Sequence, residues 1–524
     1  MEGRENAMEK RLRRRGFLKL GTAMGLCAAL EAKAPGGEAK PPAPRPPGLP
    51  QRTRAKKGEK PLDVEDPSRR VPVVREVDVV VAGGGLAGVC AAAAAARAGA
   101  TTLLVERNPF AGGNATAGLE RSVCNYFHNT KHELVIGGLP LEFIQRLVKL
   151  GAASSNWSET RGHIVFDLEL GKLALDQMLE EANADVLYDT LAADTIVEGD
   201  RLRGLIVQNR SGRQAILAGC VVDATGDADV AACAGTPLRK WDGIPHSYLF
   251  RMGNVDLQKA YQYIATHPEE YVATTDVGLS FEEWKALWEQ AGILYFHHHS
   301  TPQMPFMKEA FREQKYPDKW GPFDQMRVFQ MHGIRRTGTL VVNTGYFGMA
   351  LPDGEKISTY HRWGRKMAQH VAAFLRAALP GCENAFVDCT ASNLGLRRTR
   401  WLDGEFTLTL EMQQRATRFE DAVGRGVVMA AKSGRGSLHI TERTYDVPLR
   451  ALLPRRPMGL IIGSGRSTSS APAETLRTMP LTMVVGQGAG VAAALAAKAG
   501  TDVRDLPVEQ IQDELVRQGV RLRG

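Results

Sequence analysis

The hydrophobic pattern near the start of the folded region predicts a strand, a helix and a second strand. Residues 77–82 (VDVVVA) are a β-branched run that is typical of a buried parallel strand. An alanine-rich stretch at 86–97 predicts a helix whose small side chains let it lie close to a sheet, and 101–106 (TTLLVE) predicts the next strand. Together these elements make a βαβ unit of about 30 residues.

The pattern continues, changes and then returns. A helix is predicted over 172–181 and strands over 184–187, 202–209 and 215–223. Residues from about 240 to 390 have more aromatic residues, histidine and proline, with no βαβ rhythm, whereas a strand at 459–462 and a helix at 482–499 follow later. We therefore predict an α/β, doubly wound domain that is interrupted by an inserted α+β domain. The expected boundaries are a linker at 35–72, the first part at 73–240, the insert at 241–390 and the last part at 391–524.

The first residues resemble a twin-arginine export signal. RRRGFLKLGTAMGLCAAL spans Arg13 to Leu30, and the apolar run from Leu20 is too short to cross a bilayer. We expect residues 1–34 to be this signal peptide and the protein to be periplasmic or otherwise extracytoplasmic; the alternative is an ordinary basic tail. Pro35 directly follows a small-x-small cleavage pattern and should hinder cleavage. A membrane contact is expected only through an uncleaved leader.

Charge and cysteine content exclude several classes of protein. The formal net charge is +8, but residues 1–60 hold 15 Lys and Arg against 6 Asp and Glu, so the remainder carries −1. A near-neutral body argues against a nucleic-acid surface. The 7 cysteines show no CxxC or paired spacing, so neither a zinc site nor an iron–sulfur cluster is predicted.

A glycine fingerprint follows the first predicted strand. Gly83, Gly85 and Gly88 fit G-x-G-x-x-G between a strand and a helix, where the glycines allow a tight turn, approach of a pyrophosphate and close helix packing. Glu106, at the end of the second strand, is placed to accept hydrogen bonds from a ribose hydroxyl. The alternative is a glycine-rich turn without a ligand. The fingerprint alone does not separate NAD from FAD.

Three further segments favour FAD over NAD. A second glycine-rich loop, RNPFAGGNATAG, occupies 107–118, and a strand that ends in Ala-Thr-Gly-Asp occupies 221–227. The strand LII at 460–462 runs into GSGR at 463–466, and RTMP at 477–480 precedes a helix with the sequence GQGAG.

With these motifs in this order, the chain resembles the FAD-dependent oxidoreductases that share the FAD-binding region of heterodisulfide reductase. These proteins are related to the succinate dehydrogenase/fumarate reductase-type flavoproteins. The resemblance runs from about 77 to 522 and rests also on NLGLRRTRWLDGEF and YDVPLRALLP. It implies a glutathione-reductase-type, Rossmann-like fold and bound FAD. The residues that it implies for FAD binding are Gly83, Gly85, Gly88, Glu106, Arg107, Gly112, Gly113, Thr116, Thr225, Gly226, Asp227, Gly465, Arg466, Met479 and Pro480.

Candidate catalytic residues lie where the chain departs from its relatives. Relatives tend to carry glutamate and arginine where this chain has Arg398 and Trp401, so a substrate cannot be transferred from them. Arg397 and Arg400 are candidates to hold an oxygen-bearing or anionic substrate, or alternatively pair with Asp403 or Glu405 in a structural role. His439 is a candidate for proton transfer or a structural histidine.

Three consecutive histidines, His297, His298 and His299, do not predict a metal site. Successive side chains of an extended chain point to alternate sides, and no HxxxH or nearby acidic pair completes a ligand set. They are expected to line a substrate cavity or lie in a surface loop.

The sequence thus predicts an exported FAD-dependent oxidoreductase that transfers a hydride between a small organic substrate and FAD. An unidentified electron acceptor is expected as a partner, and no nucleic acid. One alternative is a flavoprotein that only passes electrons to a redox partner. The other is an NAD-linked Rossmann dehydrogenase, which the C-terminal flavin-like segment disfavours.

Overall fold

The computed structural model describes residues 70–158, 163–240, 243–273, 279–431, 438–472 and 476–522, and only the backbone of 163, 430, 431, 438 and 439. Residues from Arg70 onward form one unit. The expected signal peptide and nearly all of the linker lie outside the described residues. The predicted βαβ unit is confirmed as β1 (Val73–Ala82), α2 (Leu86–Arg97) and β2 (Thr102–Val105), with β1 and β2 parallel.

The first sheet is parallel at its centre. Its order is β5-β2-β1-β8-β7-β6, and β19 also pairs with β8. The pairs β1–β2, β1–β8, β2–β5 and β8–β19 are parallel, while β6, β7 and β8 form an antiparallel meander. The bounds are β5 Asp185–Leu187, β6 Leu191–Glu198, β7 Arg201–Asn209, β8 Gly212–Asp223 and β19 Leu460–Ile462. Strand β19, from the C-terminal part of the chain, therefore pairs in the sheet that the N-terminal strands begin, which agrees with the predicted α/β fold.

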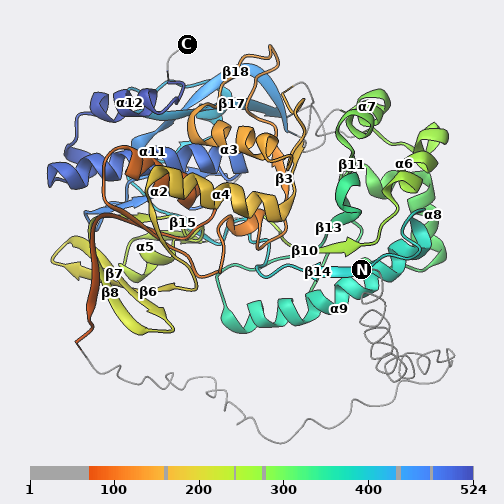
Figure 1. Ribbon diagram of the computed structural model, residues 1–524, viewed down its shortest axis with the longest axis horizontal. Helices are drawn as coiled ribbons and strands as arrows, with labels where there is room; N and C mark the ends of the chain where they lie inside the picture. Colours follow the sequence, from red (N-terminus) through yellow and green to blue (C-terminus); the bar gives the residue numbers. More distant parts are fainter. Residues whose placement is uncertain are drawn as a thin grey trace, which may run out of the picture. The chain divides into compact units, whose positions relative to one another are not determined.

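Two apolar helices pack together against this sheet. Helix α11 (Met479–Ala499) approaches α2 so closely that a Cβ at Gly486 would lie 2.1 Å from the carbonyl oxygen of Ala87. A Cβ at Gly490 would be equally close to that of Ala91. Helix α11 is long and apolar enough to cross a membrane, but 89% of its most apolar window is buried, as expected of a core helix. Around this pair lie α3 (Gly138–Lys149), α4 (Leu168–Ala182) and α12 (Val508–Arg517) (Figure 1).

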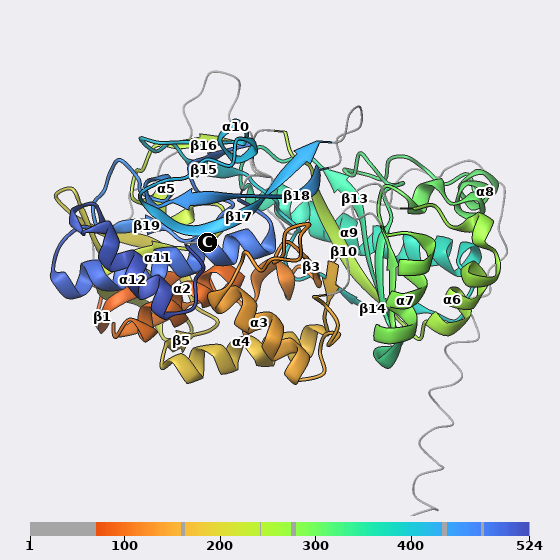
Figure 2. The same ribbon diagram turned by 90° about the horizontal axis from the view of Figure 1, so that it is seen from above.

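The residues for which the sequence predicts an insert form a second, antiparallel sheet. Its order is β11-β12-β13-β10-β14. The strands are β10 His246–Gly253, β11 Ile293–Phe296, β12 Gln330–Ile334, β13 Thr339–Phe347 and β14 Phe386–Thr390. Its helices are α6 Leu257–Thr266, α7 Phe281–Ala291, α8 Pro305–Glu313 and α9 Gly354–Ala378 (Figure 2). This part has its own aromatic core, which includes Trp284, Trp288, Tyr248, Phe250 and Phe323.

In the described part of the chain, four strand pairs and two short helices lie outside the two large sheets. They are β3 Ser122–Cys124 with β4 His163–Val165, β9 Leu238–Lys240 with β15 Arg400–Leu402, β16 Leu408–Thr409 with β20 Ser470–Ala471, β17 Ala422–Ala431 with β18 Leu438–Pro448, α5 Asp229–Cys233 and α10 Leu410–Gln414. Single 3₁₀ turns occur at Gly113–Ala115, Pro268–Glu270, Thr301–Gln303, Arg335–Thr337, Leu449–Ala451 and Val503–Asp505.

Arg121 joins the first domain to the second sheet. Its buried guanidinium donates to the carbonyl oxygens of His332 and Thr339, and to the Thr339 hydroxyl at 3.2 Å. Because a buried guanidinium needs several acceptors, this contact fixes the segment that follows the second glycine loop against β12 and β13.

Candidate functional site

The first glycine loop joins β1 to α2 at the edge of a cavity. Gly83 has a φ of +97°, and a Cβ at Gly88 would lie 1.8 Å from the Gly83 carbonyl oxygen. Gly85 is the N-cap of α2, and a Cβ at this position would meet no atom within 4 Å. Gly83 and Gly85 line the cavity, whereas Gly88 makes the close contact between strand and helix. The first N–H groups of α2 lack partners within the helix and can bind phosphate.

The second glycine loop packs on the first. Gly112 donates its N–H to the Gly84 carbonyl at 2.7 Å, and a Cβ at Gly113 would lie 3.0 Å from the Cα of Gly85. Gly112 and Gly113 have positive φ and line the cavity. Thr116, expected near the flavin, is placed differently: its buried hydroxyl donates to the Ala111 carbonyl at 2.7 Å, and it does not line the cavity. It therefore shapes the loop.

Glu106 lies at the end of β2 and lines the cavity, as does Arg107. Its Oε2 accepts from the N–H of Gly84 at 2.5 Å, and its Oε1 accepts from the backbone and side chain of Asn108 at 2.8 and 2.5 Å. A carboxylate has about four acceptor positions. The carboxylate is thus held in place by the glycine loop and retains the capacity to accept from a ribose hydroxyl.

Asp227 is the centre of a network at the end of β8. Its carboxylate accepts from Arg466 at 2.8 Å and from the hydroxyl of Thr399 at 2.7 Å. Burial opposes its charge, but Arg466 and the hydrogen bonds from Thr399 and Arg466 lower its pKa below the ordinary value. Thr225, Gly226, Asp227 and Arg466 all line the cavity. The network therefore presents a fixed arrangement of charges at the cavity wall.

The start of α11 forms another wall. Arg477, Thr478, Met479 and Thr482 line the cavity, and the N-cap Thr478 makes no side-chain capping hydrogen bond. The unpaired N–H groups and positive end of this helix can therefore stabilise negative charge. Two predicted residues have supporting positions outside the lining. Pro480 is the second residue of α11, and Gly465 donates its N–H to the Thr482 hydroxyl at 2.8 Å.

The structure places the candidate catalytic residues in different environments. Arg397 lines the cavity. Arg400 does not; it pairs with Asp229 and donates to the Asp227 carbonyl at 3.0 Å. Its partner is therefore Asp229 and not Asp403, which pairs with Arg239 at 3.0 Å. His439 lies in β18, and its side chain is outside the described part of the chain.

Glu120, which the sequence analysis did not identify, also lines the cavity. Burial raises the pKa of its carboxyl to about 7, while Arg397, the Ser122 N–H and Arg477 act in the opposite direction. Asn343 donates to its Oε2 at 3.3 Å and to Gln330 at 3.0 Å. A carboxyl with this pKa exchanges protons near neutral pH, which suits a general acid or base. The only available sequence signal was its position directly after GGNATAGL.

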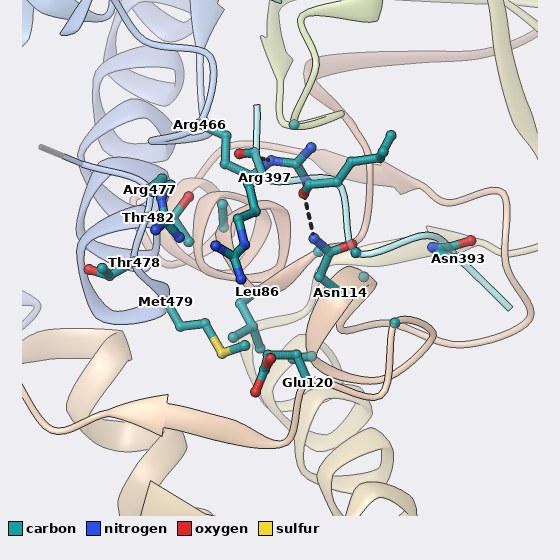
Figure 3. A pocket seen from close by; sticks show the side chains of 18 of the residues that line it. Leu86, Asn114, Glu120, Asn393, Arg397, Arg466, Arg477, Thr478, Met479 and Thr482 are labelled. Carbon is teal, nitrogen blue, oxygen red and sulfur yellow. Dashed lines mark hydrogen bonds between the residues drawn. The ribbon is translucent and has the colours of Figure 1, made fainter. Parts of the chain in front are cut away.

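One cavity of about 1590 Å³ connects these features. Small-ligand cavities usually measure about 300–1,000 Å³, so this one has room for a dinucleotide and a second molecule. Figure 3 shows Arg397, Arg466 and Arg477 on one side in that view, with Glu120 and Met479 facing them. His297, His298 and His299 line the cavity as well, and the described residues contain no group of three His, Cys, Asp or Glu that could hold a metal ion.

The residues present fit a dinucleotide cofactor. Two helix N-termini face the cavity, Gly85 leaves space for a phosphate, and Glu106 is held at the end of β2. The family model described as "FAD dependent oxidoreductase" matches residues 78–515. That match includes both glycine loops, the Asp227 segment, the second sheet and α11.

The individual proteins that resemble this chain do so over part of their length or at low sequence identity. Thiamine thiazole synthase of Aeropyrum pernix is 34% identical over 131 residues, which are 25% of this chain and 43% of that protein, so less than half of that relative is spanned. A geranylgeranyl bacteriochlorophyll reductase-like protein (Ta0516) of Thermoplasma acidophilum has a TM-score of 0.39 at 14% identity, covering 84% of this chain and 82% of the other. For p-nitrophenol 4-monooxygenase of Pseudomonas putida DLL-E4 the TM-score is 0.36 at 12% identity, covering 85% of each chain.

Proposed function

The chain belongs to the family of FAD-dependent oxidoreductases, and from this we propose that it transfers a hydride between a small organic substrate and bound FAD. The observation that carries the proposal is that the walls of one continuous cavity include both glycine loops and strands of the second sheet. A substrate that lies against the second sheet can thereby share the cavity with the cofactor.

Residues from the whole first domain would hold FAD. Gly83, Gly85 and the start of α2 would bind the pyrophosphate, and Glu106 would bind the ribose. The second glycine loop, the Asp227–Arg466 pair and the start of α11 would follow the rest of the molecule. FAD supplies a two-electron oxidant that accepts a hydride from a C–H bond. The positive end of α11 would stabilise the negative charge that then develops nearby.

Oxidation of a hydroxyl or amino group also releases a proton. The C–H bond would break with its hydride going to FAD, the O–H or N–H bond would break with its proton going to an acceptor of the protein, and a C=O or C=N bond would form. Glu120 supports this role because it lines the cavity and has a pKa of about 7. Asn343 holds its Oε2, and Arg121, the next residue, anchors the segment to the second sheet. Glu120 is therefore fixed in position and able to accept a proton at neutral pH.

The test is spectroscopic. Protein purified without added flavin should show the visible absorption of FAD, and anaerobic addition of one member of a panel of sugars, hydroxy acids and amines should bleach it. A colourless protein that also fails to bind FAD contradicts the proposal, and NADH binding without flavin would favour the dehydrogenase alternative. A flavoprotein that no small molecule reduces, but that a redox partner reduces, would instead be an electron carrier.

We propose further that the enzyme is exported after folding and passes its electrons to an acceptor outside the cytoplasm. Arg14 and Arg15, followed by Phe17-Leu18-Lys19 and an apolar run, support a twin-arginine signal. The cavity is lined by residues from Gly83 to Thr482, so a cofactor site can form only after nearly the whole chain has folded. An export route for folded proteins fits this requirement.

A further inference from the structure

We propose that Arg397 binds the carboxylate of the substrate, so that this enzyme acts on small organic acids that carry an oxidisable hydroxyl or amino group. The inference rests on the function proposed above, because the subsite lies in the same cavity. It names the substrate class, which neither the family nor the relatives supply.

Among the described residues, the guanidinium of Arg397 has no acceptor. In this part of the chain it forms no hydrogen bond and no ion pair, and it lies over the ring of Tyr346 at 4.8 Å from the centroid. Its backbone is nevertheless fixed: its N–H donates to His246 at 3.0 Å, and its carbonyl accepts from Arg466 at 3.1 Å. An immobilised cation of this kind, at the wall of a cavity, is a site that an anion can complete.

Two neighbouring arginines, Arg466 and Arg400, differ from Arg397 in their contacts. Arg466 also lines the cavity but pairs with Asp227 at 2.8 Å. Arg400, which does not line the cavity, pairs with Asp229, which does. The positive charges of Arg466 and Arg400 are therefore balanced by acids, whereas the charge of Arg397 is available to an anion in the cavity.

The acids of the cavity do not compete for Arg397. Glu106 accepts from Gly84 and Asn108, Asp227 pairs with Arg466, and Asp229 pairs with Arg400. Glu120 is close enough to Arg397 for their charges to interact, yet these two described side chains form no ion pair with each other. Both side chains line the cavity, so a ligand group there can contact a cation and a carboxyl that is largely uncharged below neutral pH.

The charge and shape of this subsite favour a carboxylate over a phosphate. A carboxylate carries one negative charge and accepts two parallel hydrogen bonds from a planar guanidinium. The second charge of a phosphate monoester would meet Glu120 when that carboxyl is ionised. His128 and His361 also line the cavity. Because burial lowers the pKa of both rings, neither adds a positive charge at neutral pH that could balance the second charge of a phosphate.

Uncharged polar groups on the second sheet complete the subsite. Gln330 of β12 and Asn343 of β13 are cross-strand partners, are hydrogen-bonded to each other and line the cavity. The Oδ1 atom of Asn343 is buried and has no donor within the described residues. A buried acceptor without a donor costs free energy, which a substrate hydroxyl or amino group could recover with a small movement of this amide. Glu120, which Asn343 contacts, is then beside the group that loses its proton.

The experiment compares acids with their amides on the FAD-bound protein. Benzoate and acetate, which cannot be oxidised here, are titrated against benzamide and acetamide while the absorption spectrum of bound FAD is followed. The carboxylates should bind at least tenfold more tightly than the amides. Arg397→Gln should lose at least tenfold of that affinity, Arg397→Lys should recover part of it, and Arg415→Gln, which removes an exposed charge elsewhere, should bind like the wild type.

Equal binding of acids and amides, no binding of any acid up to 100 mM, or unchanged binding by Arg397→Gln would each overturn the inference. If Arg397→Gln no longer binds FAD, the inference is tested by two other measurements: the relative affinity of the wild type for acids and amides, and the affinity of Arg397→Lys for the acids. The anaerobic panel separates the two proposals. Bleaching by lactate or mandelate but not by lactamide or mandelamide supports both, whereas bleaching by neutral alcohols alone supports hydride transfer and contradicts the carboxylate subsite.

Discussion

Arg466 donates to Asp227 at 2.8 Å although 239 residues separate them in sequence. Asp227 follows β8, whereas Arg466 follows β19, and these strands are neighbours in the first sheet. Both side chains are mostly buried, with exposed fractions of 16% for Arg466 and 11% for Asp227. The pair thus joins the N-terminal and C-terminal parts of the FAD-binding domain at the cavity wall.

Asp227→Asn should destabilise the protein and weaken FAD binding. The substitution leaves Arg466 as a buried charge without its partner, which costs about 3 kcal/mol of unfolding free energy. Chemical denaturation measures this loss, and the flavin-to-protein ratio after gel filtration measures FAD retention. The control is Asp194→Asn, because Asp194 pairs with Arg213 on the surface and such pairs contribute below about 1 kcal/mol. Equal effects of the two variants would contradict the structural role of the Arg466–Asp227 pair.

Two glycines of the fingerprint should respond differently to alanine. A methyl group at Gly85 meets no atom within 4 Å and would enter the cavity, whereas at Gly88 it would lie 1.8 Å from the Gly83 carbonyl oxygen. Gly85→Ala should therefore fold with nearly normal thermal stability of the flavin-free form but bind FAD at least tenfold more weakly. Gly88→Ala should instead lower the thermal stability of the flavin-free protein. Calorimetry with FAD titration distinguishes these outcomes.

Gly354→Ala, at the start of α9, is the control for the glycine variants, because a methyl group there also meets no atom within 4 Å. This variant should change the free energy of unfolding by less than about 0.5 kcal/mol and leave FAD affinity unchanged. Tight FAD binding by Gly85→Ala would place the cofactor away from this loop.

The parallel strands at the centre of the first sheet were predictable because they are mostly apolar runs, and α2 and α11 because they are rich in alanine. Strand β6 was not predicted, because its sequence LAADTIVE mixes polar and apolar residues. The second sheet was not, since its strands lie among loops and its core depends on contacts between distant aromatic residues such as Trp284 and Phe323. Short strands such as β11, with 4 residues, carry too little periodicity to be identified from sequence.

The cofactor loops were also predictable, because each is a local pattern of glycines next to a strand. Glu120 was not, because its raised pKa arises from burial by segments far away in sequence. Arg397 and Arg400 show the same limit. They lie three positions apart in one segment, and only the fold places Arg397 at the cavity and Arg400 beside Asp229.

The proposed export signal has a direct test. Replacing Arg14 and Arg15 together by lysine should keep the protein in the cytoplasm, because the twin-arginine pathway requires this pair. Cell fractionation with an antibody locates the protein, and flavin fluorescence shows that the retained protein is folded with FAD. Lys33→Arg, which keeps the charge outside the motif, is the control. Export of the double variant at the wild-type level would contradict the twin-arginine route.

Glu120→Gln should remove a pH-dependent step from the reaction. A proton acceptor must be ionised, so anaerobic FAD reduction should become faster as the pH rises through about 7, the pKa of Glu120. The variant should lack this rise and react about 10²–10⁴-fold more slowly, whereas the exposed Glu198→Gln should behave like the wild type.

The pH dependence of stability gives a second readout for Glu120. Because folding raises the pKa from 4.5, the protonated carboxyl stabilises the fold, and this contribution is lost as the pH rises to about 7. Between pH 5 and pH 8 the wild type should therefore lose stability relative to Glu120→Gln, and parallel denaturation curves would contradict the buried, proton-exchanging carboxyl.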